Sequence, residues 1–111
     1  MVINLIPLIS LIWLHFVADF ILQSDSVAKG KSKSNNVLAY HVAIYTLPFL
    51  LFNPIFGLVN GFLHFITDYC TSRATSYLWQ KNERHWFFVV IGLDQAIHMT
   101  CLVLTYVWLV Q

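Results

Sequence analysis

The segment His64–Asp68, HFITD, places a histidine and an aspartate four residues apart inside a long apolar stretch. On a helix this spacing brings both side chains to one face, one turn apart. The spacing recurs in His15–Asp19, HFVAD, and in reversed order in Asp94–His98, DQAIH. One short chain therefore carries three imidazole–carboxylate pairs in apolar surroundings, and its fold has to accommodate all of them.

The composition predicts a membrane protein. Of the 111 residues, 59% are hydrophobic and 10% are charged, whereas a soluble domain is about 25% charged. From Ser34 to Thr67 the chain has no Lys, Arg, Asp or Glu. We therefore expect an integral membrane protein with a single domain over residues 1–111, which leaves no room for a separate soluble catalytic module.

Four apolar segments of spanning length predict an all-α fold, an integral membrane four-helix bundle. Polar connections at residues 24–36 and 80–85, and a turn at Asn53-Pro54, separate these segments. The expected helices cover about residues 2–22, 37–51, 55–79 and 86–110.

The positive residues predict the topology. Every Lys and Arg lies in one of two stretches, residues 29–33 and 73–84. The positive-inside rule places such stretches in the cytoplasm. In the inner membrane of a cell, loops 24–36 and 80–85 would then be cytoplasmic, and both termini would face outward.

The depth of the polar residues predicts one shared site. Counted at about 1.5 Å per residue from the cytoplasmic boundaries, seven ionisable groups lie roughly 6–18 Å deep, and the outer half has nothing comparable. The seven residues come from all four helices: His15, Asp19, His41, His64, Asp68, Asp94 and His98.

Three buried carboxylates require neutralisation. A charged Asp at mid-membrane costs about 2.5–3.5 kcal/mol, so Asp19, Asp68 and Asp94 together would cost roughly 7–10 kcal/mol. One or two divalent ions would balance this charge, and all seven residues are candidate ligands. Imidazole and carboxylate without thiolate suit Zn, Mn or Fe. The alternative is a purely structural set of His–Asp hydrogen bonds between helices.

Residues around the predicted site suggest further roles. We expect Arg73 and Arg84 to lie at its mouth and to bind an anionic head group. Gln23 and Gln95 border it, either as hydrogen-bond donors to the ligands or as ordinary polar-face residues. The lysines between 29 and 33 are interpreted as topology determinants that also contact anionic lipid.

Three motifs resemble a known family. They are HFxxDFxLQ at residues 15–23, HFxTDYxTSR at 64–73 and RHWFFxxIGxDQxxH at 84–98. Together with Lys31-Ser32-Lys33 they resemble a small bacterial and phage membrane-protein family catalogued only as a domain of unknown function. The resemblance implies that these positions are the family's signature, and it brings no activity. A looser similarity is to membrane-bound metal-dependent hydrolases.

The leading hypothesis is a metal-dependent hydrolase that acts on a lipid or lipid-linked phosphate at the cytoplasmic leaflet. A bound metal would lower the pKa of a water molecule, and Asp94 or Asp19 would act as the catalytic base. The alternatives are an oligomeric ion or proton conductor and a small partner-binding membrane subunit whose cluster is structural. Membrane lipid is the expected partner, nucleic acid is not, and a homo-oligomer is compatible with the sequence.

Overall fold

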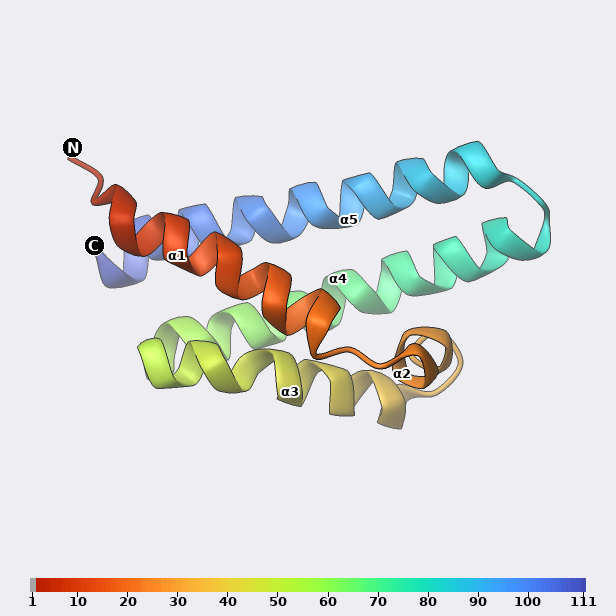
Figure 1. Cartoon of the computed structure of the whole chain (residues 1–111), viewed down its shortest axis with the longest axis horizontal. Helices are drawn as coiled ribbons and strands as arrows, with labels where there is room; N and C mark the ends of the chain where they lie inside the picture. Colours follow the sequence, from red (N-terminus) through yellow and green to blue (C-terminus); the bar gives the residue numbers. More distant parts are fainter. Residues whose placement is uncertain (1) are drawn as a thin grey trace.

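The computed structural model describes residues 2–111, and over that range it contains helices and no strands. This confirms the predicted all-α class. The elements in chain order are α1 (Leu5–Phe16), the π-helical segment η1 (Val17–Ile21), α2 (Asp25–Gly30), α3 (Asn35–Phe52), α4 (Pro54–Gln80), α5 (Arg84–Thr105) and the π-helical segment η2 (Tyr106–Val110) (Figure 1).

Local sequence signals explain where the helices begin. The side chains of Ser24, Ser34 and Asn53 each accept a hydrogen bond from a backbone N–H in the first turn of α2, α3 and α4. Such caps satisfy donors that a helix start leaves unpaired. Pro54 follows Asn53 at the first position of α4, where its missing N–H has no cost. Asn82, with φ of 59°, turns the chain from α4 into α5.

The four long helices alternate in direction. α4 packs against α3 on one side and against α5 on the other, while α1 contacts α5 and its continuation η1 contacts α3. Both termini and the α3–α4 turn lie at one end of the molecule, which we call the terminal end (Figure 1). α2 and the turn between α4 and α5 lie towards the other end, which we call the loop end.

The connection at residues 24–36 differs from the sequence-based expectation, because it contains the short helix α2. Ser24 caps this helix and Gly30 ends it. α2 packs against α3. The six residues of α2 carry no helical apolar repeat, so periodicity alone does not predict this helix.

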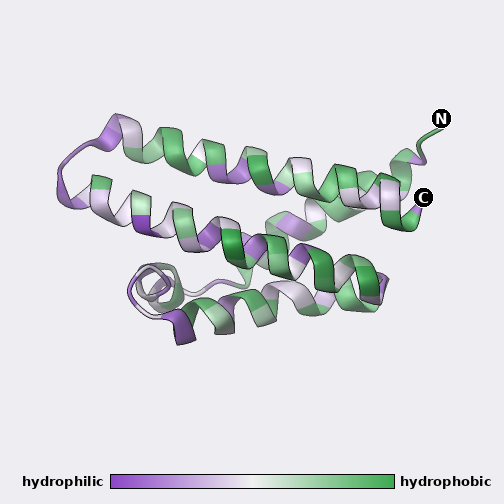
Figure 2. Ribbon diagram, turned by 180° about the vertical axis from the view of Figure 1, so that it is seen from behind, coloured by the Kyte–Doolittle hydropathy of each residue, from purple (hydrophilic) through white to green (hydrophobic). Residues whose placement is uncertain are grey.

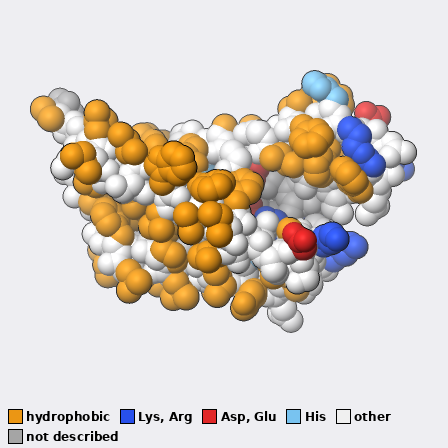
Figure 3. All heavy atoms as spheres, viewed as in Figure 1, with side chains coloured by type: hydrophobic (Ala, Val, Ile, Leu, Met, Phe, Trp, Pro, Cys, Tyr) orange, Lys and Arg blue, Asp and Glu red, His pale blue; other side chains and the backbone are white. Residues whose placement is uncertain are grey.

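The molecule has a largely apolar exterior and buries polar as well as apolar side chains. Leu51 and Trp108 are 90% and 81% exposed, whereas His15 and His64 are 1% exposed. Figures 2 and 3 show hydrophobic residues over the outside of the long helices. Exposed apolar surfaces of this size are rare in soluble proteins.

Two helical stretches, Asn35–Phe52 and Arg84–Val110, are long and apolar enough to cross a membrane, and Leu5–Ile21 is a shorter apolar helix. The sequence analysis predicted four spans. The long helix α4 falls outside this set because Asn60, His64 and Asp68 and the polar turns after them lower its mean hydropathy.

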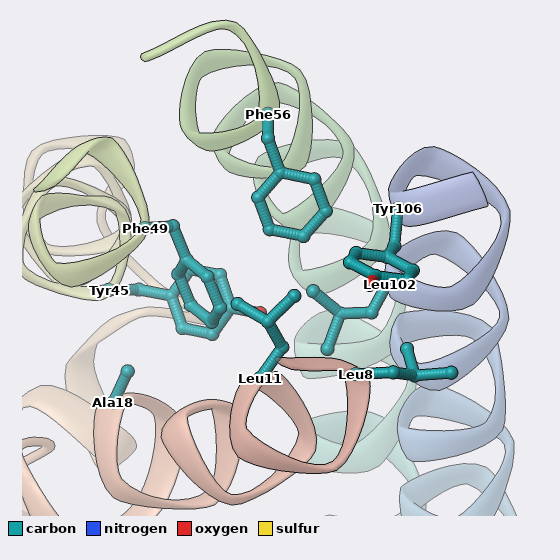
Figure 4. Packing of buried hydrophobic residues seen from close by; sticks show 8 residues of the cluster. All are labelled: Leu8, Leu11, Ala18, Tyr45, Phe49, Phe56, Leu102 and Tyr106. Atoms are coloured by element: carbon teal, nitrogen blue, oxygen red, sulfur yellow. The ribbon is translucent and has the colours of Figure 1, made fainter. Parts of the chain in front are cut away.

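An apolar core fills the terminal end. In this core, α1 and η1 contribute Leu8, Leu11 and Ala18, which pack against residues of α3, α4, α5 and η2 (Figure 4). These other members of the core are Tyr45, Phe49, Phe56, Leu102 and Tyr106. Close helix contact supports this core at Gly57, where a Cβ atom would lie 2.6 Å from the backbone nitrogen of Leu50. The core therefore depends on a glycine that lets α3 and α4 approach closely.

Candidate metal centre

The structure brings all seven predicted ionisable residues into one connected cluster on the loop-end side of the apolar core. Six are at most 4% exposed, and Asp94 is partly buried. Every one of the seven has a ring nitrogen or carboxylate oxygen within 4 Å of another member. The convergence expected from depth along the helices is therefore present.

Four residues from three elements form the first ligand group. Nε2 of His41 lies 3.1 Å from Nε2 of His64, 3.1 Å from Oδ1 of Asp19 and 3.2 Å from Oδ2 of Asp68. Nε2 of His64 lies 3.4 Å and 3.3 Å from the same two oxygens. Four ligands about 2.0–2.1 Å from a tetrahedral zinc ion lie about 3.3–3.4 Å from one another. Five of the six distances among these four atoms are therefore close to those of a tetrahedral metal site.

A second ligand group adjoins the first and shares Asp19 with it. Its members are Asp19, Asp94 and His98, whose ligand atoms lie within 4.8 Å of one another. Nε2 of His98 lies 3.2 Å from Oδ1 of Asp94 and 3.3 Å from Oδ1 of Asp68. Oδ2 of Asp68 therefore faces the first group, and Oδ1 of Asp68 contacts His98 of the second group. The cluster is suited to hold a metal ion, and its two groups provide adjacent positions.

The pair His15–Asp19 lies where α1 continues into the π-helical segment η1. Nε2 of His15 is 3.7 Å from Oδ2 of Asp19. Asp19 lies within η1 and also approaches His41 and His64. Such π-helical turns frequently occur at functional sites.

His15 lies in the cluster but belongs to neither ligand group. Its Nε2 is 2.9 Å from Oε1 of Gln95, and its Nδ1 is 2.7 Å from the hydroxyl of Tyr45. The amide nitrogen of Gln95 donates to Asp19 and Asp94. The carbonyl oxygen of Gln95 therefore accepts from His15, and Nδ1 of His15 accepts from Tyr45. His15, predicted as a ligand, thus orients Gln95, and Gln95 orients two carboxylates.

Tyr45 and Thr71 were missed by the sequence analysis. The ring of Tyr45 stacks on His64 with a centroid distance of 3.8 Å. The hydroxyl of Thr71 donates to Oδ1 of Asp94 at 2.6 Å. A signal existed for Tyr45, because it follows His41 by one helical turn.

A cavity of about 610 Å³ leads from the loop end to the cluster. Asp19, Asp68 and Asp94 line its inner part. Lys29, Lys31 and Lys33, from α2 and the turn after it, line its outer part; Figure 3 shows the hollow on that face.

Lysines occupy the place where the sequence analysis expected arginines. Nζ of Lys31 lies 2.9 Å from Oδ2 of Asp68. Arg73 and Arg84 lie outside the cavity lining. Their guanidinium groups stack on the rings of Tyr69 and Trp79, at 3.7 Å and 3.5 Å. Each also donates to the carbonyl of that same aromatic residue, and these contacts hold both arginines on the helix exterior.

The two predicted glutamines have different surroundings. Gln95 lies between the cluster carboxylates, as described above. Gln23 lines the cavity, and its buried Oε1 has no hydrogen-bond partner among residues 2–111. The carbonyl oxygen of Gln23 therefore accepts no hydrogen bond from a candidate ligand.

The chain belongs to the family described as "Protein of unknown function (DUF3307)", whose model matches residues 7–111. This confirms the resemblance to a family of unknown function that the three motifs suggested. No curated protein and no solved structure matches the chain. The looser likeness to membrane-bound metal-dependent hydrolases therefore stays a prediction.

Proposed function

We propose that this protein is a membrane-embedded, metal-dependent hydrolase of a lipid or lipid-linked phosphate. The observation that carries the proposal is the spacing of Asp19, His41, His64 and Asp68, whose ligand atoms lie 3.1–3.4 Å apart in the five pairs given above. Hydrogen-bonded side chains with a structural role alone do not require two imidazole nitrogens and two carboxylates to converge on one point. A cation at that point satisfies all four.

The membrane location rests on the polarity of the molecule. Its large exposed side chains are mostly apolar, and its buried polar groups point inward. α4 and the α5–η2 stretch each contain 27 residues, about 40 Å of helix, which exceeds the thickness of a bilayer core of about 30 Å. We propose four spans in the inner membrane, with α2 and the α4–α5 turn in the cytoplasm.

The cavity supports a hydrolase more than an ion path. It lies towards the loop end, and the apolar core fills the bundle between the cluster and the terminal end. Lysines near its mouth and apolar side chains such as Phe20, Phe87 and Ile91 along its wall suit an amphiphile with an anionic head group.

A general base is available in the cavity wall. The side chain of Asp94 is 14% exposed, compared with 2% for Asp68 and 5% for Asp19. Thr71 and Gln95 hold both of its oxygens in place. A metal ion in the adjacent group would supply a water of lowered pKa, and Asp94 is placed to accept its proton.

Metal content is the first test. We expect detergent-purified protein, grown with added zinc or manganese, to retain metal in mass spectrometry, and His64→Ala to lose it. His85→Ala is the matched control, because His85 is exposed and stacks edge-on against Trp86 outside the cluster. Wild-type protein without bound metal would overturn the proposal.

Hydrolysis is the second test. We expect phosphate release from short-chain phosphatidic acid by the wild type and its loss in Asp94→Asn, while the variant retains the ion of the first ligand group. Asp25→Asn, at the exposed start of α2, is the control. Equal turnover by wild type and Asp94→Asn would remove Asp94 from the mechanism, and no turnover by metal-loaded wild type would remove this substrate.

A further inference from the structure

Lys31 is a cation built into the metal-ligand cluster. Its ammonium group lies 2.9 Å from Oδ2 of Asp68, and its side chain is 16% exposed. The same oxygen lies 3.2 Å from Nε2 of His41 and 3.3 Å from Nε2 of His64. Lys31 therefore touches an atom of the first ligand group itself.

The charge of the cluster changes when Lys31 is counted. Asp19, Asp68 and Asp94 contribute −3 and Lys31 contributes +1, so with neutral histidines the sum is −2. One divalent ion brings this sum to zero, and two ions bring it to +2. Because charges in a buried site are poorly screened, a net charge of +2 there is strongly unfavourable.

The two ligand groups differ in the metal-free state. Both oxygens of Asp94, in the second group, already accept hydrogen bonds, from Thr71 at 2.6 Å and Gln95 at 3.0 Å. In the first group, Oδ1 of Asp19 faces the imidazoles of His41 and His64, and Oδ2 of Asp68 faces both imidazoles and the Lys31 ammonium group. The first group offers four ligand side chains and the second offers three, so we expect the first group to fill first.

Asp68 can keep Lys31 while the first group is filled. A carboxylate oxygen has two lone pairs, so Oδ2 can accept from the ammonium group and face an ion at once. The other oxygen, Oδ1, is 3.3 Å from Nε2 of His98 in the second group. Lys31 thus stays beside a carboxylate of the first group whose other oxygen contacts His98 of the second group.

We propose that Lys31 takes the place of a second divalent ion, so that the protein holds one ion until an anion in the cavity draws Lys31 away. The second group, Asp19, Asp94 and His98, then fills, and a two-ion site assembles only with the anionic substrate present. This inference rests on the proposed function, because it assigns the order in which that site is loaded.

The cavity contains groups that would receive the anion. Lys29 and Lys33 line it beside Lys31, and neither forms an ion pair with a carboxylate among residues 2–111. Ser72 also lines the cavity, is 7% exposed, and has a hydroxyl without a hydrogen-bond partner in that part of the chain. An anion with several oxygens, such as a phosphate group, would bind Ser72 and the three lysines together.

The test counts zinc per chain after gel filtration at buffered free zinc. We expect about one equivalent for the wild type and about two for Lys31→Met, because the variant removes the charge that opposes the second ion. Lys81→Met is the matched control, with about one equivalent expected, since Lys81 lies outside the cavity lining, with its ammonium group over the ring of Tyr77. Lys31→Gln, a polar replacement, and circular dichroism show that any change follows the charge rather than misfolding.

The anion is tested separately, with inorganic phosphate and with dihexanoyl phosphatidic acid. We expect one or both to raise wild-type zinc to about two equivalents, and dihexanoyl phosphatidylcholine to leave it unchanged. A response to both probes indicates a free phosphate site, and a response to the lipid alone indicates a head-group site.

The outcomes separate this inference from the proposed function. Wild-type protein without zinc would overturn both. A wild type with one equivalent and Lys31→Met with one equivalent would overturn the inference about Lys31 and leave the metal site in place. Two equivalents in the wild type without an anion would also overturn it.

Discussion

The terminal end and the loop end of the bundle are built on opposite principles. At the terminal end, side chains such as Phe49, Phe56 and Leu102 are fully buried, and the polar link between helices there runs from Asn60 to Thr105 at 2.9 Å. Towards the loop end, the interior holds imidazoles, carboxylates and a cavity of about 610 Å³. The terminal end therefore stabilises the bundle by apolar packing, whereas the loop end holds the candidate metal ligands and the cavity.

This division has an energetic consequence. Burial of apolar surface and close packing stabilise the terminal end without specific partners. The cluster contributes stability only if every buried charge is paired, and an ion pair lost from one side leaves an uncompensated charge. We therefore expect substitutions at the terminal end to lower stability, and substitutions in the cluster to lower metal affinity.

The largest expected effect is at Asp68, which serves both ligand groups and Lys31. Asp68→Asn should abolish metal retention, because each oxygen loses its negative charge and the Lys31 ammonium loses its partner. Since a supporting residue alone is worth about 10–100-fold in metal affinity, a shared ligand should cost more than 100-fold. Metal titration measures this, with Asp25→Asn as control; equal affinity in both variants would contradict the two-group cluster.

The next largest effect is expected at the opposite end. Phe56→Ala should destabilise the protein by about 3–5 kcal/mol, because a fully buried ring leaves a cavity. Thermal unfolding in detergent measures the loss, and metal content of the folded fraction should match the wild type. Phe62→Ala is the control, since Phe62 lies on the same helix and is 66% exposed. Loss of metal in folded Phe56→Ala would show that the two ends are coupled.

A smaller effect is expected from glycines in the helices. Gly57→Ala should destabilise the bundle by about 1–3 kcal/mol, because its Cβ would lie 2.6 Å from the backbone nitrogen of Leu50. Gly92→Ala meets nothing within 4 Å and should stabilise α5 by up to about 1 kcal/mol. Unfolding temperatures of the two variants should move in opposite directions; a shared direction would contradict close packing at Gly57.

The smallest effect is expected at Tyr45, which touches both regions. Tyr45→Phe keeps the ring that stacks on His64 and removes the hydroxyl that holds His15. We expect metal affinity to fall about tenfold, as for other residues that orient ligands indirectly, with stability changed by about 1 kcal/mol. Metal titration and unfolding of Tyr40→Phe, at an exposed tyrosine on the same helix, provide the baseline.

Much of the site was predictable because helical spacing is local. The pairs His64–Asp68 and Asp94–His98 have ring-to-carboxylate distances of 3.3 Å and 3.2 Å, as their spacing on one helix requires. His41 was predicted from its depth, and the structure places it at the centre of the first ligand group. The pair His15–Asp19 is also present, with Nε2 of His15 3.7 Å from Oδ2 of Asp19, while Oδ1 of Asp19 lies closer to His41 and His64.

The sequence by itself determined the all-α class, the four long helices and the faces on which the polar residues lie, because apolar periodicity and i, i+4 spacing act within one helix. Only the tertiary structure decided that Lys31 reaches Asp68, that Arg73 and Arg84 stay on the exterior, and that Asp68 serves two ligand groups. The physical reason is that these contacts join residues on different elements, so they depend on helix packing and on the path of the chain through α2.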